Sequence, residues 1–396
     1  MKVGKPKQLW QLAFDHDWPT SVAFLKNGRF LAAGNRRGEI LLWDLSQPPS
    51  KSTGKTTKDA PNLKPARKFV GHDNAITHLV NTPDGKTLIS SSLDRTIRFW
   101  NPDASPTGTG DVVLDFKSRV RKSRRKSEKI KEKILFAPGL SIQTVKATKV
   151  LGHHRDWIKA LDISSNGKRI ISGDDSCVTI VYDLATNKVV SRWTGYNRVW
   201  VSSVALSPDA KTAFTAEFAG SRSSFDRPAA QARVWNADDG KMKLDLLKTW
   251  TPKVTDKDRI DSYGYARTWG KLMKRGLIAA QYSADGSRLA VAQGGETSKG
   301  QVHLIDTKSG KILRTVSGHR SGACDVKFSA DGKLVLSSGR DTTVRICKVS
   351  DGKEIAALGR GRGGQFKDWL SAIAISADQK HVAAADIAGM IHVWQL

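Results

Sequence analysis

Short apolar stretches with alternating polar positions recur along the whole chain, separated by turns rich in Gly, Asp and Asn. Each copy runs from an alternating stretch through a turn such as Pro-Asp-Gly-Lys to a second apolar stretch. A polar turn and a third stretch follow, and the third usually ends in an aromatic residue with Asp or Asn. This alternation predicts short β-strands joined by tight hairpins. Seven copies occupy residues 21–45, 76–101, 158–184, 202–240, 278–310, 324–352 and 371–396.

Between copies lies a further strand that is followed by Gly-His, at His72, His153 and His319. Third strands end in Trp43-Asp44, Trp100-Asn101 and Trp235-Asn236. These residues resemble the signature of the WD-repeat family, in which a repeat of about 40–45 residues forms one four-stranded propeller blade. The resemblance implies an all-β fold: one seven-bladed β-propeller over residues 1–396, with four-stranded antiparallel blades.

The two ends of the chain predict how the ring closes. The chain ends on a third strand, at residues 391–396, so the last blade lacks its fourth strand. Residues 7–18 match the pattern of a fourth strand. An N-terminal strand that completes the last blade would hide both sheet edges, which otherwise invite pairing with other chains. Removal of residues 7–14 should therefore destabilise the whole ring.

In WD-repeats a buried hydrogen-bonded chain links the Gly-His histidine, a second-strand Ser or Thr, an Asp in the next turn and the third-strand Trp. Here the resemblance assigns these roles to His72, Asp94 and Trp100 in blade two, with Ser90 or Ser92 as the hydroxyl. The corresponding histidines are His153 in blade three and His319 in blade six, the latter with Asp341. Blade six has Cys347 in place of Trp, and blade three has Tyr182 with a displaced acid, Asp174 or Asp175. We expect weaker or absent networks in those two blades.

The chemistry of the chain argues against catalysis and cofactors. The histidines lie in different blades and cannot converge on one metal ion at about 2 Å. The three cysteines, Cys177, Cys324 and Cys347, form no C-x-x-C pair, so neither a disulfide framework nor a zinc site is expected. No P-loop, H-E-x-x-H or G-x-S-x-G motif is present. We expect no enzymatic activity, no metal and no cofactor.

No signal peptide and no apolar run of membrane-spanning length is visible in the sequence. Few, widely separated cysteines favour a reducing compartment. We therefore expect no transmembrane segment and a cytoplasmic location.

Propeller topology assigns each connection to one of two faces. Connections from a fourth strand to the next first strand, and from a second to a third strand, open on the face called the top. Two insertions follow third strands and are expected at the bottom, namely residues 46–64 in blade one and 102–140 in blade two. A further insertion, residues 252–275, precedes blade five at the top.

The centre of the blade-two insertion, residues 117–133, holds ten Lys or Arg and two Glu. Two interpretations stay open: a basic arm that lies on phosphate, or a solvated charged loop. The basic arm includes Arg119, Arg121, Lys122, Arg124, Arg125 and Lys126.

Four blades place a tryptophan just before the first strand, at Trp18, Trp157, Trp200 and Trp369. These positions predict an aromatic rim on the top face, although such residues can also serve only to cover the core. The same loops supply Arg36, Arg37, Arg155, Arg198, Arg320, Arg340 and Arg360. Arginine suits bidentate contacts with carboxylate or phosphate and stacks on aromatic rings.

The formal charge of +27 predicts acidic partners, because 65 Lys and Arg oppose 38 Asp and Glu. The first hypothesis is a non-catalytic scaffold whose top face binds an acidic or phosphorylated protein or peptide, acting as a monomer within a larger assembly. The second is a propeller associated with nucleic acid or ribonucleoprotein, which grips RNA or DNA phosphates through residues 117–133 and the top-face arginines.

Overall fold

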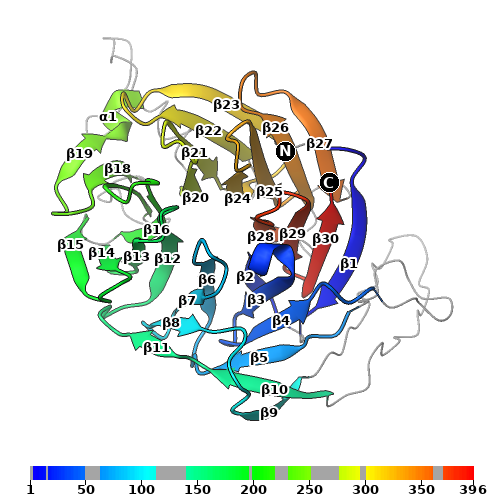
Figure 1. Cartoon of the computed structure of the whole chain (residues 1–396). Helices are drawn as coiled ribbons and strands as arrows, with labels where there is room; N and C mark the ends of the chain where they lie inside the picture. Colours follow the sequence, from blue (N-terminus) through cyan, green and yellow to red (C-terminus); the bar gives the residue numbers. More distant parts are fainter. Residues whose placement is uncertain are drawn as a thin grey trace, which may run out of the picture.

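A computed structural model describes residues 3–14, 17–49, 63–112, 140–195, 199–218, 231–250, 276–294, 300–359 and 369–396. The described strands form seven β-sheets arranged in a ring around a central axis (Figure 1). The fold expected from the sequence, an all-β propeller of seven mostly antiparallel blades, is confirmed. Helix is confined, in the described part, to a 3-10 turn η1 (Lys26–Gly28) and to α1 (Leu246–Trp250).

Six blades have four strands each, with the first strand innermost. Blade two is β6 (Ile76–Asn81), β7 (Leu88–Ser92), β8 (Ile97–Trp100) and β11 (Lys149–Leu151). Blade three is β12 (Ile158–Ile163), β13 (Arg169–Asp174), β14 (Val178–Asp183) and β15 (Val189–Thr194). Blade four is β16 (Trp200–Leu206), β17 (Thr212–Phe218), β18 (Gln231–Asn236) and β19 (Met242–Asp245).

Blades five to seven continue the same order around the ring. Blade five is β20 (Leu277–Tyr282), β21 (Arg288–Gln293), β22 (Gly300–Asp306) and β23 (Ile312–His319). Blade six is β24 (Ala323–Phe328), β25 (Leu334–Gly339), β26 (Thr343–Lys348) and β27 (Glu354–Gly359). Blade seven is β28 (Leu370–Ile375), β29 (His381–Asp386), β30 (Met390–Gln395) and β1 (Lys7–Ala13).

Blade one is larger than expected, because two extra strands extend its sheet. Its sheet order is β2-β3-β4-β5-β10-β9. Strand β10 pairs in parallel with β5 and antiparallel with β9. Both extra strands come from the chain between the third and fourth strands of blade two, where the sequence predicted an insertion over 102–140. The strands of this sheet are β2 (Pro19–Leu25), β3 (Phe30–Asn35), β4 (Ile40–Asp44), β5 (Arg67–Val70), β9 (Gly108–Val112) and β10 (Leu140–Lys146).

This enlargement has a simple physical cause. The outer edge of β5 offers unpaired backbone N–H and C=O groups, and an extended segment nearby can satisfy them. The chain after β8 therefore crosses to blade one, pairs there, and returns to blade two as β11 (Figure 1).

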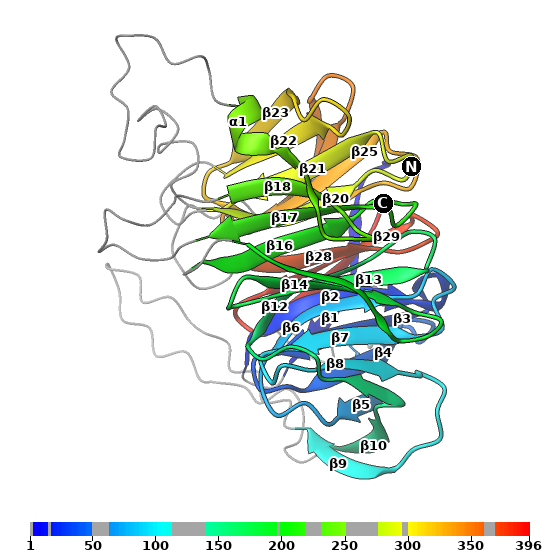
Figure 2. The ribbon, with the colours of Figure 1, turned by 90° about the vertical axis from the view of Figure 1, so that its left-hand side faces the viewer.

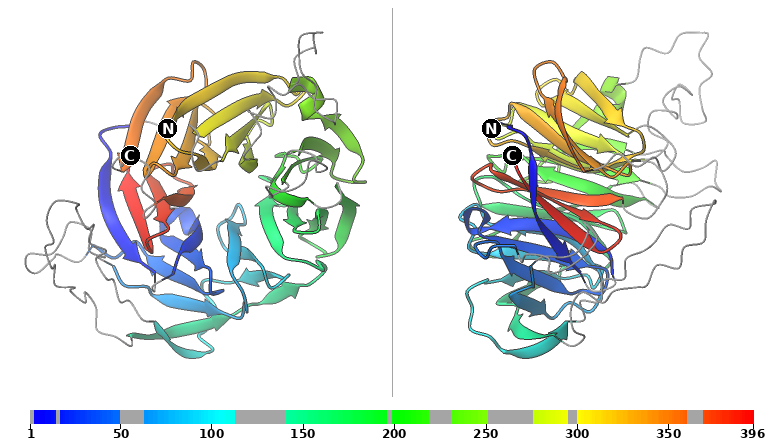
Figure 3. Two further views of the ribbon diagram at one scale, coloured as in Figure 1. Left: turned by 180° about the vertical axis from the view of Figure 1, so that it is seen from behind. Right: turned by 90° about the vertical axis from the view of Figure 1, so that its right-hand side faces the viewer.

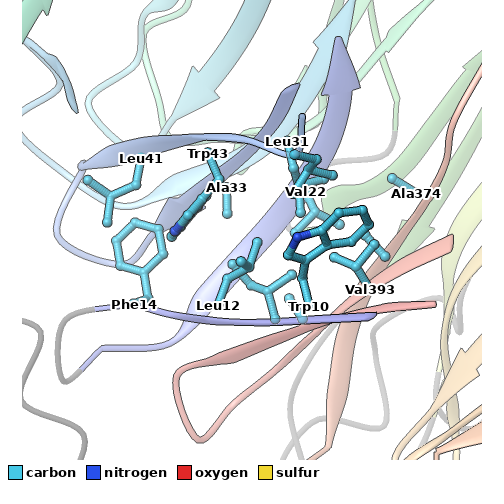
Figure 4. Close-up of a cluster of buried hydrophobic side chains, with 14 of the residues drawn as sticks. Trp10, Leu12, Phe14, Val22, Leu31, Ala33, Leu41, Trp43, Ala374 and Val393 are labelled. Carbon is cyan, nitrogen blue, oxygen red and sulfur yellow. The ribbon is translucent and has the colours of Figure 1, made fainter. Parts of the chain in front are cut away.

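The N-terminal strand closes the ring, as the sequence predicted. Strand β1 pairs antiparallel with β30, from Lys7 opposite Gln395 to Ala13 opposite Met390. Trp10, Leu12 and Phe14 bury their side chains between blades seven and one (Figure 4). The two termini lie close together on the same side of the ring (Figures 2 and 3).

The innermost strands are linked around the central axis by side chains. These strands have no partner on their inner side, so some of their backbone N–H groups need another acceptor. A polar side chain of the preceding blade accepts in each of four cases: Ser21 from Leu79, Asp162 from Leu206, Gln281 from Phe328 and Asp325 from Ile373. The inner polar residues thus bond one blade to the next.

Candidate functional site

A buried hydrogen-bonded chain in blade two ties together the two top loops of that blade. Trp100 Nε1 lies 2.8 Å from Ser90 Oγ, which lies 2.7 Å from His72 Nε2. His72 Nδ1 lies 2.6 Å from Asp94 Oδ2. Because the indole can only donate, Ser90 accepts from Trp100 and donates to His72, whose Nδ1–H then donates to Asp94. Ser90, rather than Ser92, supplies the hydroxyl.

The protonation of this chain follows from its burial. Burial lowers the pKa of His72, so the neutral ring that the hydrogen bonds require is favoured. Burial alone would raise the pKa of Asp94, but hydrogen bonds from His72 and Thr96 outweigh it and hold that pKa well below its ordinary value. A satisfied network of this kind fixes the loops that carry the top face.

In blade three the network uses His154 and not His153, which corrects the sequence expectation. His154 Nδ1 lies 2.8 Å from Asp174 Oδ2 and its Nε2 lies 2.6 Å from Ser172 Oγ. His153 is exposed and rests its ring against Tyr182, with centroids 5.5 Å apart. The top loop of blade three carries two successive histidines, so the Gly-His dipeptide is a misleading guide there.

A fixed spacing would have found the right histidine. In blades two, three and six, the histidine precedes its serine partner by 18 residues. The first two strands of these three blades pair in the same register, which fixes that number.

Blade six also has a complete His–Ser–Asp set. His319 lies 2.9 Å from Asp341 and 2.8 Å from Ser337. The expectation of weak or absent networks in blades three and six was therefore wrong for these three members. Only the fourth member, the Trp donor, is replaced, by Tyr182 and Cys347.

Blade four contains a buried ion pair instead of a His–Asp pair, and the sequence did not lead us to expect it. Trp235 Nε1 donates to Thr215 Oγ1 at 2.8 Å, but the glycine before this blade, Gly195, is followed by Tyr196 and not by histidine. Arg233 and Glu217 pair in the interior at 3.1 Å. The acidic residue inside an otherwise apolar second strand was the available signal.

The structure places the four predicted rim tryptophans at or just before the innermost strands β2, β12, β16 and β28. Trp18 is 43% exposed and Trp157 is 47% exposed, which is high for tryptophan. Trp200 and Trp369 are half-buried. Two of the four rings are thus open to solvent.

Three of the rim rings have a cation over them. The guanidinium of Arg36 lies 4.7 Å from the ring centroid of Trp18, and that of Arg340 lies 4.3 Å from Trp369. Lys159, which the sequence analysis did not single out, lies 5.2 Å from Trp157. Such contacts hold the cation in place over the ring.

The acidic side chains of the rim form hydrogen bonds within their own loops. Asp17 Oδ1 accepts the N–H of Trp18, and Asp156 Oδ1 accepts the N–H of Trp157, each at 2.8 Å. Asp156 Oδ2 also accepts from Ser176, a contact that helps to lower the pKa of this carboxyl. These carboxylates shape the loops. By contrast, Arg37, Arg95, Arg155 and Arg320 are exposed, and none of them makes an ion pair with another described residue.

Several predicted site residues lie outside the described part of the chain. They are Arg198 and Arg360 of the top face and the basic arm, which comprises Arg119, Arg121, Lys122, Arg124, Arg125 and Lys126. Both interpretations of the arm stay open.

The described acidic and sulfur-containing side chains offer no metal centre. No group of three or more His, Cys, Asp or Glu converges among them. The inner carboxylates Asp162 and Asp325 serve as acceptors between blades, and burial raises the pKa of Asp162 to about 6. No helix within the described ranges has the length and apolar character needed to cross a bilayer.

Seven blades, three of them locked by the His–Ser–Asp arrangement, define a β-propeller with the internal chemistry of WD-repeats. Comparison with known families agrees: the model for "WD domain, G-beta repeat" matches residues 7–44, 63–101, 145–183 and 310–348. The chain is therefore a seven-bladed β-propeller that carries WD40 repeats. Each match spans the fourth strand of one blade and the first three of the next.

Individual relatives match only part of the chain. Residues are 35% identical over 97 positions to "Autophagy-related protein 16" of Arabidopsis thaliana, which is 24% of this chain and 19% of that protein. "Protein hir-1" of Neurospora crassa is 37% identical over 101 positions, 24% of this chain and 10% of that protein. "Autophagy-related protein 18" of Meyerozyma guilliermondii is 31% identical over 98 positions, covering 24% and 17%. The matches thus span less than a fifth of these relatives.

Proposed function

We propose that this chain is a non-catalytic interaction scaffold whose top face binds an acidic protein or peptide. The observation that carries the proposal is the pairing of exposed Trp18 with Arg36, together with the rim arginines that have no acidic partner in the described structure. Aromatic residues and arginine dominate the energetics of protein interfaces. Because Asp17 and Asp156 accept backbone N–H groups of their own loops, they do not neutralise the exposed rim arginines, and an acidic partner can do so.

The charge of the rim favours an anionic ligand over a cationic one. An aromatic cage for a methylated lysine needs ring faces that are open to the ligand. Here a side-chain cation already lies over Trp18, Trp157 and Trp369. A second cation would be repelled, whereas a carboxylate would be attracted.

The relatives support a scaffold role in a limited way. Their names describe no catalysed reaction, and the part shared with this chain is WD40 repeat. The absence of catalysis, cofactor and metal, the monomeric state within a larger assembly and the cytoplasmic location stay predictions.

The test is a pull-down with the full chain, with and without nuclease treatment. We expect protein partners that survive nuclease and that are lost when Trp18 and Trp157 are both replaced by Ala. The matched control is Leu313→Ala, which removes an apolar side chain that is 54% exposed on the outer strand β23. Equal loss of partners with the control variant would count against a top-face site.

The nucleic-acid alternative rests on the basic arm and makes a separate prediction. Contacts to about six to ten phosphates would weaken binding by roughly 10³–10⁵ between 50 and 200 mM salt, with little dependence on base sequence. Retention of nucleic acid alone, with no protein surviving nuclease, would favour this alternative over the scaffold.

A further inference from the structure

Blades one, two and three differ at one position of the top face, the residue directly before the first strand. That residue is Trp18 in blade one, Ala75 in blade two and Trp157 in blade three. The local backbone is alike in all three blades, because the Oδ1 of the preceding Asp or Asn accepts the N–H of this residue at 2.8 Å. Blade two therefore places a small side chain between two large ones.

The two tryptophans are exposed, whereas the residue between them is buried. Trp18 is 43% exposed and Trp157 is 47% exposed, against 8% for Ala75. Beside Ala75 lies the half-buried Leu93, whose N–H donates to the Ala75 carbonyl at 2.9 Å. An apolar floor thus separates two exposed rings. We define the two-tryptophan arc as Trp18, Ala75, Leu93 and Trp157 with the cations of the same loops, Arg36, Arg37, Arg95, Arg155 and Lys159.

The loops of blades one and two are packed against each other. Figure 1 shows β2, β6 and β12 as neighbouring inner strands of the three blades. Gly38 has a φ of +84°, and a Cβ there would lie 2.7 Å from the carbonyl oxygens of His72 and Asn74. The turn that carries Arg36 and Arg37 therefore rests on the top loop of blade two.

The charge of Arg95 acts between blade two and blade three. Arg95 is exposed and has a φ of +70° in the turn between the second and third strands of blade two. The hydroxyl of Ser176 contributes most to lowering the pKa of Asp156, and the positive charge of Arg95 contributes as well. Asp156 in turn accepts the N–H of Trp157. A cation of blade two thus lies near the loop that carries the second exposed ring.

The loops of the arc keep an excess of positive charge for a ligand. Asp17 and Asp156 each accept a backbone N–H, and Asp175 pairs with Lys159 at 3.4 Å. Asp73 is exposed and makes no ion pair with another described residue. Four exposed arginines likewise make none within the described part of the chain, namely Arg36, Arg37, Arg95 and Arg155.

We infer that the two-tryptophan arc binds an extended acidic peptide that carries one apolar side chain on each side of its acidic residues. This inference rests on the proposed function and adds the location of the site and the chemistry of its ligand. The apolar side chains pack on Trp18 and Trp157, and the carboxylates meet the arginines of the arc. The two rings are separated by a whole blade, so the ligand is extended where it crosses Ala75 and Leu93.

The first experiment tests the ligand with fluorescein-labelled peptides, in which glutamate runs of increasing length are flanked by one leucine at each end. Anisotropy titrations with the full chain should show binding. Removal of either leucine should raise Kd about tenfold, because the second anchor no longer acts at the high effective concentration that the first provides. A lysine run with both leucines, the control for charge sign, should not bind.

The second experiment locates the site with variants of the full chain. Trp18→Ala and Trp157→Ala should each raise Kd at least about tenfold. Ala75→Trp should raise Kd to a similar extent, because a third ring obstructs the path between the other two. The loop can accommodate it, since blades one and three carry tryptophan at this position with the same backbone hydrogen bond.

Two matched controls accompany these variants. Ala75→Ser keeps a small side chain at the same position, and it should leave Kd at the wild-type value. Lys333→Gln removes an exposed cation from the turn between β24 and β25, on the bottom face, and should also leave Kd unchanged. Circular dichroism of each variant establishes that the ring is folded.

The outcomes separate the inference from the proposed function. An unchanged Kd for Ala75→Trp, or a loss of binding with Arg320→Ala in blade six, places the peptide elsewhere on the top face and overturns only the arc. Equal binding of peptides without leucine overturns the two anchors. Failure of every peptide to bind overturns the inference, while the pull-down decides the proposed function independently.

Two further outcomes concern the nature of the binding. A loss with Lys333→Gln as large as that with Trp18→Ala means that overall charge holds the peptide, and it overturns both the arc and the top-face site. An RNA oligonucleotide that displaces the peptide from the arc at lower concentration than the peptide itself overturns the choice of an acidic peptide.

Discussion

Arg233 Nη1 lies 3.1 Å from Glu217 Oε1 and 3.2 Å from its Oε2, in the interior of blade four. The carboxylate also packs closely against the backbone of Gly195. A Cβ added at Gly195 would lie only 2.6 Å from Glu217 Oε2 and 2.5 Å from Cys177 Sγ. Blade four therefore contains a buried Arg–Glu pair, whereas blades two, three and six each contain a His–Asp pair.

Breaking this pair should be costly. Glu217→Gln leaves the Arg233 charge buried without its counter-ion, and we expect a loss of about 3–5 kcal/mol in the free energy of unfolding. The measurement is urea denaturation followed by tryptophan fluorescence. Adding Arg233→Met should restore part of the loss, because the stranded charge is removed. Asp239→Asn, at an exposed pair with Lys241, should leave the midpoint unchanged, and an equal loss there would refute the argument.

The two neighbouring histidines of blade three should behave in opposite ways. His154→Ala leaves the buried Ser172 and Asp174 without their partner and should cost about 1–3 kcal/mol. His153→Ala alters only an exposed ring and should change stability by no more than about 0.5 kcal/mol. Thermal melts of both variants side by side provide the check. Comparable losses would mean that the roles are not divided in this way.

The N-terminal strand should stabilise the ring far beyond its own length. Leu12 is fully buried between blades seven and one, so Leu12→Ala should cost about 2–5 kcal/mol. Deletion of residues 7–14 should lower the unfolding midpoint more and expose the edge of β30 to aggregation. Lys7→Ala, at the exposed start of β1, is the control. Denaturation measures the unfolding midpoint and light scattering measures aggregation. A deletion variant that stays monomeric and as stable as the full chain would contradict the prediction.

His303 should make stability depend on pH. It is buried in blade five between Thr315 and Gln293, and burial lowers its pKa to about 4. Between pH 6.5 and 4 the unfolded chain binds a proton there that the folded chain does not. As far as His303 determines it, the free energy of unfolding is therefore highest above pH 6.5. It decreases by about 3 kcal/mol as the pH falls to about 4.

His303→Gln removes this group and should flatten the dependence over that interval, measured by urea titrations at several pH values. Asp162, whose pKa burial raises to about 6, acts in the opposite direction between pH 6 and 4. The comparison must therefore be made against wild type at each pH. A parallel pH profile in the variant would contradict the assignment.

Local sequence patterns predicted the blades well, because the repeat encodes alternation and turns within about 40 residues. The pattern at residues 7–18 even predicted a contact between the two ends of the chain, since an incomplete last blade needs a fourth strand. The choice between His153 and His154 was missed for the opposite reason. Strand register, set by pairing across β12 and β13, decides which histidine reaches Ser172.

By itself, the sequence determined an all-β ring of seven blades, its closure by β1 and the positions of the rim tryptophans. Only the tertiary structure decided what lies against what: Arg36 over Trp18, Glu217 against Arg233, and β10 alongside β5. The first two pairs join different loops or strands of one blade, and the third joins segments that come from two different repeats. Their pairing depends on the space left by neighbours and on which buried groups still need a partner, and no local pattern records either.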